Sequence, residues 1–145
     1  MTDILRYLKR NNFFTGRLLT AEDRSLEQEY FREKLKRHNR FLHGFGVVFG
    51  LDVSRRTSEV LISSGLALDC VGNDLIVPEP AKLTLPDPER MGETIFIGLE
   101  FVEREVDPTP GNSSLIVNSR IEEIASAVFM KQNSNSGHRH IKGRG

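Results

Sequence analysis

The chain has 145 residues, of which 38% are hydrophobic and 8% aromatic, and its 20 Lys and Arg balance its 20 Asp and Glu. This composition is typical of one globular domain, and a single cysteine, Cys70, excludes an internal disulfide scaffold. No apolar stretch approaches the roughly 20 residues that span a bilayer, and the charged start lacks a signal peptide's apolar run. We therefore expect synthesis and folding in the cytoplasm.

The charges are unevenly distributed, with a net charge of +4 in residues 1–50, −7 in residues 51–110 and +3 in residues 111–145. Opposite charges of this kind can attract segments of one chain or dock each segment on a different neighbour. Ordinary solvated faces are the more common explanation. A neutral chain without a recognition motif gives no reason to expect nucleic-acid binding.

The first element in chain order is a predicted helix over residues 20–43. Thr20 is typical of an N-cap, Glu22 and Asp23 suit the positive end of the helix dipole, and no Gly or Pro follows before Gly44. Apolar or aromatic side chains recur at helical spacing: Leu26, Tyr30, Phe31, Leu35, His38 and Leu42. At 1.5 Å per residue the helix would be roughly 35 Å long. One small sheet cannot cover such a helix, so part of its stripe is expected to meet another subunit.

Short apolar runs separated by turn residues then predict a β-rich region over residues 45–106. Gly72-Asn73 is the clearest hairpin signal. The fold class is α+β, with a long N-terminal helix followed by a mainly antiparallel β-sheet or small β-sandwich. The predicted strands are Phe45–Val53, Glu59–Ile62, Leu66–Cys70, Leu75–Val77, Leu83–Leu85 and Thr94–Glu103.

The last third of the chain is less regular. Residues 107–114 are rich in Pro, Gly and Ser and are predicted to form a surface loop. Residues 115–130 are apolar enough to pack, but their pattern fits either a helix or a strand. Residues 131–145 are polar and basic and predict a flexible tail.

The histidines and the cysteine do not form a recognisable metal or catalytic pattern. His38 and His43 are five residues apart, which places them on different faces of an α-helix. His138 and His140 lie in the tail without carboxylate or thiolate support. Cys70 follows an apolar run and is expected to pack. We therefore expect no metal and no cofactor.

Sequence templates for catalysis are also missing. The run Gly44-Phe-Gly-Val-Val-Phe-Gly50 follows a helix, whereas a phosphate-binding loop precedes one, so its glycines are expected to end the helix and allow close strand packing. Asp69 and Asp74 flank the hairpin and are expected to serve the turn rather than acid-base chemistry. No catalytic residue is predicted, and the chain is not expected to be an enzyme.

Three blocks of sequence carry a family resemblance: NNFFTGRLLTAED, LEQEYFREKLKRHNRFLHGFGVVFGL and SGLALDCVGNDLIVPE. In this order they resemble small proteins encoded among the structural genes of phage-tail-like contractile injection systems. The resemblance covers most of residues 7–106 and implies an architectural part at or near the baseplate. Arg24 stands where similar sequences more often have a bulky apolar residue, and the tail has no counterpart.

The resemblance leads to a docking hypothesis, in which residues 7–19 and the helix contact baseplate, sheath or tail-tube subunits of the same particle. The apolar anchors would be Phe13, Phe14, Leu18 and Leu19, with Arg17, Arg32 and Arg37 at the rim. The chain then divides into a docking segment 1–19, a single α+β domain 20–130 and the tail 131–145. Assembly is expected in the cytoplasm, and membrane association only through the particle.

A small β-rich module that binds carbohydrate or another surface is the alternative. Its site would use loops such as 86–93 and 107–114. The chain has no Trp and two Tyr, which makes a poor aromatic stacking platform.

Overall fold

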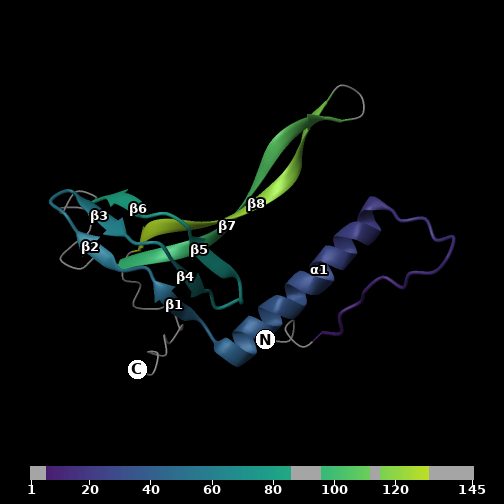
Figure 1. Ribbon diagram of the computed structural model, residues 1–145, viewed down its shortest axis with the longest axis horizontal. Helices are drawn as coiled ribbons and strands as arrows, with labels where there is room; N and C mark the ends of the chain where they lie inside the picture. Colours follow the sequence, from purple (N-terminus) through teal and green to yellow (C-terminus); the bar gives the residue numbers. More distant parts are fainter. Residues whose placement is uncertain (1–5, 86–95, 112–114, 131–145) are drawn as a thin grey trace. The chain divides into compact units, whose positions relative to one another are not determined.

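A computed structural model describes residues 6–85, 96–111 and 115–130 of the chain. These residues form two compact units. The first consists of residues 6–45 together with Leu68–Asn73, and the second contains residues 46–67 and the described residues from 74 onward. One helical segment and several mainly antiparallel strands confirm the α+β class (Figure 1). The division into docking segment, domain and tail stays a prediction.

Helix α1 spans Ala21–His38 and forms the first unit with the segment before it. Thr20 is its N-cap, as predicted, and exchanges hydrogen bonds with Asp23 in a capping box. The five residues Asn39–His43 form a π-helical turn, η2, instead of continuing the α-helix to the predicted end. Gly44, with a φ of 80°, ends the turn, and its amide donates to the Asn39 carbonyl over 2.9 Å.

The turn between two later strands also belongs to the first unit. Gly72 has a φ of 103° and lies so close to the Lys36 backbone that a Cβ would clash with it. The buried Asn39 side chain donates from Nδ2 to the Gly72 carbonyl over 3.0 Å. This turn is therefore fixed on the end of the helix.

The second unit consists of strands. A three-stranded sheet has the order β1-β4-β5, a second has the order β2-β3-β6, and a hairpin pairs β7 with β8 (Figure 1). The pairs β2-β3, β3-β6 and β7-β8 are antiparallel. The bounds are β1 Gly46–Gly50, β2 Val53–Arg55, β3 Glu59–Ile62, β4 Gly65–Leu68, β5 Asp74–Val77, β6 Ala81–Thr84, β7 Phe96–Pro110 and β8 Ile116–Met130.

The hydrophobic core lies in the second unit. Alternate residues of β3, β4 and β5 are buried, as expected of strands with one face inward. The buried residues are Leu51, Val60, Ile62, Ala67, Leu75 and Val77, with partly buried side chains of β6, β7 and β8 packed against them. The described residues of the first unit contribute no buried hydrophobic side chain.

The predicted strand Phe45–Val53 is wrong as one element, because the chain turns between β1 and β2. Gly50 and Leu51 both have a positive φ, 63° and 60°. A Cβ on Gly50 would clash with the backbone of Ser64, so the close approach of strands expected of this glycine is confirmed. The predicted strand Leu66–Cys70 also ends early, at Leu68, because Asp69 begins the turn.

The long hairpin corrects one prediction and decides an open one. Residues 107–110, expected in a loop, continue β7 and pair with β8, from Pro108↔Asn118 to Pro110↔Ile116. Asp107 has a φ of 58° and interrupts the pairing without changing the register. Residues 116–130 are a strand, because they satisfy their backbone groups along the full length of β7. Residues 86–93, 112–114 and 131–145, on which other loop and tail predictions fall, lie outside the described residues.

Candidate interaction site before the helix

A group of polar contacts holds the segment before α1 against the first turn of the helix. The Arg17 guanidinium pairs with Asp23, with Nη2 2.6 Å from Oδ1, and donates from Nη1 to the Asn12 carbonyl over 2.7 Å. Asn11 is buried, and its Nδ2 donates to the Asp23 carbonyl over 2.5 Å. Its backbone amide donates to Oε2 of Glu27 over 3.3 Å. We call Asn11, Arg17 and Asp23 the polar clamp.

The clamp carboxylate is held in its charged form. The hydrogen bond from the Thr20 backbone lowers the pKa of Asp23 below its usual range, and the Arg17 guanidinium lowers it further. Asp23 therefore acts both as the partner of the helix cap and as the anion that orients Arg17. The same carboxylate joins the helix start to the preceding loop.

The loop closed by the clamp displays apolar side chains to solvent. The Arg17 amide donates to the Phe14 carbonyl over 3.2 Å, and Gly16 supplies the positive φ of 87° that this tight turn requires. Phe13 and Phe14 are 59% and 65% exposed, and Leu18 is 85% exposed. Leu19 is less exposed than these three. Four predicted anchors thus lie close together in sequence around one turn, with their side chains uncovered.

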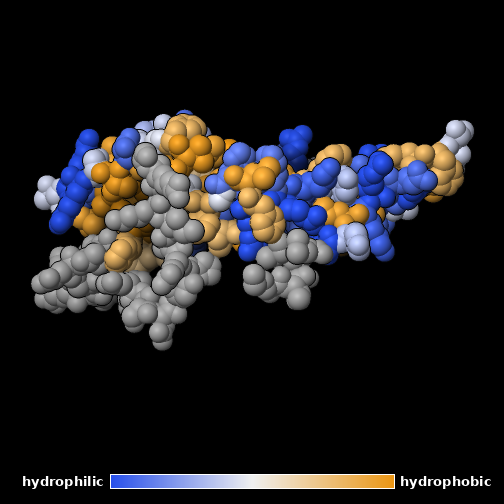
Figure 2. Space-filling model, turned by 90° about the horizontal axis from the view of Figure 1, so that it is seen from below, coloured by the Kyte–Doolittle hydropathy of each residue, from blue (hydrophilic) through white to orange (hydrophobic). Residues whose placement is uncertain are grey.

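The helix also leaves its apolar stripe uncovered. None of the 18 residues of α1 is buried, and Phe31 and Leu35 are more than half exposed. Leu42, in η2, is 70% exposed. The space-filling view shows hydrophobic residues at the molecular surface beside hydrophilic ones (Figure 2). Large apolar side chains exposed in this number are typical of a surface that another molecule covers.

The three arginines predicted at the rim have different environments. Arg17 is mostly covered and serves the clamp, so its side chain contacts its own unit. Arg37 donates from Nη2 to the Arg6 carbonyl over 3.0 Å and holds the N-terminal segment on the helix. Arg32 is exposed on α1.

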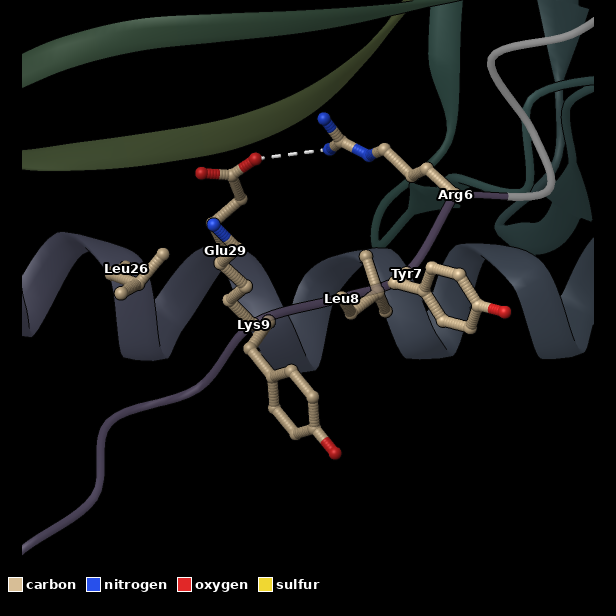
Figure 3. Close-up of a pocket in the computed structure, with 7 residues that line it drawn as sticks. Arg6, Tyr7, Leu8, Lys9, Leu26 and Glu29 are labelled. Carbon is tan, nitrogen blue, oxygen red and sulfur yellow. Dashed lines mark hydrogen bonds and ion pairs between the residues drawn. The ribbon is translucent and has the colours of Figure 1, made fainter.

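A small hollow of about 180 Å³ lies between residues 6–9 and α1 (Figure 3). Arg6 and Glu29 point toward one another across it and form an ion pair of 3.0 Å, whereas the Tyr7 ring is fully exposed. Leu8, Leu26 and Tyr30 supply its apolar lining. The two charged groups neutralise each other, so the hollow offers anchorage for the segment rather than an acid-base pair.

The residues set aside as catalytic candidates have structural surroundings. Oδ1 of Asp69 accepts hydrogen bonds from the Val71, Gly72 and Asn73 amides, which confirms its turn role. Burial acts to raise the pKa of Asp69, but the hydrogen bonds from Asn73, Gly72 and Val71 outweigh it and lower the pKa below its usual range. Cys70 is half-buried in the same turn. No group of three metal-binding side chains occurs among the described residues.

The expectation that His38 and His43 face apart is wrong. Their Nε2 atoms lie 3.2 Å apart and their ring centroids 5.0 Å apart. The α-helical spacing on which the expectation rested does not apply, because η2 is π-helical and brings residues five apart onto one face. The burial of Asn11 could not be predicted, since the run Asn11-Asn12-Phe13-Phe14 matches no capping or turn pattern.

Comparisons with protein-family models, with curated proteins and with solved structures yield no match. Within the described residues, no helix has the length and apolarity needed to cross a membrane. The alternative of a β-rich binding module with a site in loops is weakened, because residues 107–110 of its expected site lie in a paired strand.

Proposed function

We propose that the chain is a non-enzymatic structural component of a contractile, phage-tail-like injection machine, at or near its baseplate. It acts through contacts with baseplate, sheath or tail-tube subunits of the same particle. Residues 7–19 and the helical residues 20–43 serve together as one long N-terminal docking element. Assembly takes place in the cytoplasm, and the chain needs no cofactor.

The observation that carries this proposal is the exposure of Phe13, Phe14 and Leu18 on a turn that the polar clamp fixes to the start of the helix. A loop fixed by hydrogen bonds keeps its apolar side chains in one arrangement, so a partner that buries them does not first have to order the loop. Full burial of one such side chain contributes roughly 1.5 to 3 kcal/mol. The sequence resemblance supplies the kind of partner, and the exposed stripe of α1 extends the surface.

The test is incorporation of a Phe13→Ala/Phe14→Ala chain into particles purified from cells that make them. Loss of two anchors is expected to reduce incorporation by roughly tenfold or more. Ile116→Ala/Val117→Ala is the matched control, because it removes exposed apolar side chains of the β7-β8 hairpin, outside the docking element. Circular dichroism and thermal melting are used to check that both variants fold. Normal incorporation of the Phe13/Phe14 variant would refute the anchor role.

A further inference from the structure

The π-helical turn at the end of α1 places two imidazoles in a specific relation. His38 is the last residue of α1 and His43 the last of η2, and both side chains are exposed. The planes of the rings are inclined by 60°, and the Nε2 atoms are the atoms that meet, 3.2 Å apart. Short π-helical segments are rare and occur frequently at functional sites.

The distance between the two nitrogens matches the requirement of a metal ion. A tetrahedral ion with metal-nitrogen bonds of about 2.0 to 2.1 Å holds two ligand nitrogens about 3.3 Å apart. The two nitrogens already stand at this separation, so both can bind one ion without a change in the distance between them. Because the pair is exposed, an ion has access from solvent and water can complete its coordination.

We propose that His38 and His43 bind a transition-metal ion of the zinc class through both Nε2 atoms. The site goes beyond the docking function, because it depends on η2 and not on any partner. Its nitrogen ligands select the kind of ion. Lys36, Arg37 and Arg40 repel every cation, so binding has to come from nitrogen-metal bonds, which zinc, nickel and copper form and calcium and magnesium do not favour.

Binding of the ion is expected to stabilise the turn that forms the site. The same turn contains Asn39, whose side chain fixes Gly72 on the helix end. An ion bound by both His38 and His43 therefore stabilises η2. It also stabilises the contact between Asn39 and the Asp69–Asn73 turn. A hydrogen bond between two neutral imidazoles gives the same distance in the absence of metal, so the test has to detect the bound ion itself.

The test uses the full chain with His138→Asn and His140→Asn, so that imidazoles of the tail do not contribute. Zinc chloride is titrated by calorimetry in a buffer that does not bind metals, and the imidazole nitrogens are followed by long-range ¹H-¹⁵N NMR. We expect one ion per chain and a change of the Nε2 signals of both His38 and His43. His43→Gln and, separately, His38→Gln are expected to weaken binding by roughly tenfold or more.

Arg40→Gln is the matched control, because it removes a neighbouring cation and leaves both imidazoles in place. Its zinc affinity is expected to equal or exceed that of the parent chain. Unchanged affinity in His43→Gln, or Nε2 signals that do not move at millimolar zinc in the chain that retains both residues, would overturn the proposal. The NMR result does not depend on whether a variant folds.

Discussion

Different interactions stabilise each of the two units of the chain. The second unit has a core of six buried apolar residues, from Leu51 to Val77, between its strands. The first unit buries Asn11 and Asn39 instead, and its large apolar side chains face solvent. The second unit combines its core with exposed apolar side chains on β1 and on the outer β7-β8 hairpin, whereas the described residues of the first unit rely on hydrogen bonds and have no apolar core. The difference separates the part of the chain that supports the fold from the part that we propose docks.

The largest effect is expected from a cavity in the core of the second unit. Ile62 is 2% exposed, so Ile62→Ala should lower the free energy of unfolding by about 2 to 5 kcal/mol. Ile76→Ala, at an exposed position of β5 in the other three-stranded sheet, should change the free energy of unfolding by much less. Denaturant unfolding measures both variants. Equal losses would mean that the buried face has been wrongly assigned.

A smaller and local effect is expected from the polar clamp. Arg17→Ala removes the ion pair with Asp23 and the hydrogen bond to the Asn12 carbonyl, so local opening of the loop should become easier. Hydrogen exchange should increase over residues 11–19 while the amides of β3 and β4 stay protected, because the core is untouched. Arg24→Ala, on the exposed side of the first helical turns, serves as the control. Protection of residues 11–19 that survives the loss of Arg17 would show that the clamp does not order the loop.

The smallest effect is a dependence on pH at the turn that joins β4 and β5. The pKa of Asp69 is lowered in the folded chain, so its charge stabilises the turn above the ordinary Asp pKa of about 3.9 and this stability is lost as pH falls below that value. The protection factors of the Val71, Gly72 and Asn73 amides, which correct for the pH dependence of intrinsic exchange, should therefore decrease on acidification. In Asp69→Asn the protection factors of the same amides should lose most of their dependence on pH in this range. A parent chain whose turn amides respond no more to acid than those of the variant would contradict this origin.

Local patterns were the part of the fold that could be predicted. Thr20 caps the helix, β3 spans the predicted residues, and Gly72-Asn73 marks a turn, because in each case the relevant groups are neighbours in sequence. The full length of β7 and β8 could not be predicted, since it depends on pairing between strands and overrides the Pro and Gly signals near Asp107.

The candidate site shows the same limit. The proposed apolar anchors could be predicted from the run of Phe and Leu, and their side chains are exposed. The clamp was not visible, because Asn11 finds its partners 12 and 16 residues away on the helix. The meeting of His38 and His43 was excluded by α-helical geometry, and only the switch to a π-helical turn reverses that conclusion.

The β7-β8 hairpin has a consequence for how related chains can differ in size. Its described pairs run without a shift in register from Phe96↔Met130 to Pro110↔Ile116, but only its base contributes residues that pack on the core. Removing two residues from each strand of the outer half would shorten the hairpin by roughly 7 Å and leave every remaining side chain on its original face. The length of the outer hairpin can therefore change by two residues per strand while the packing of its base on the core stays the same.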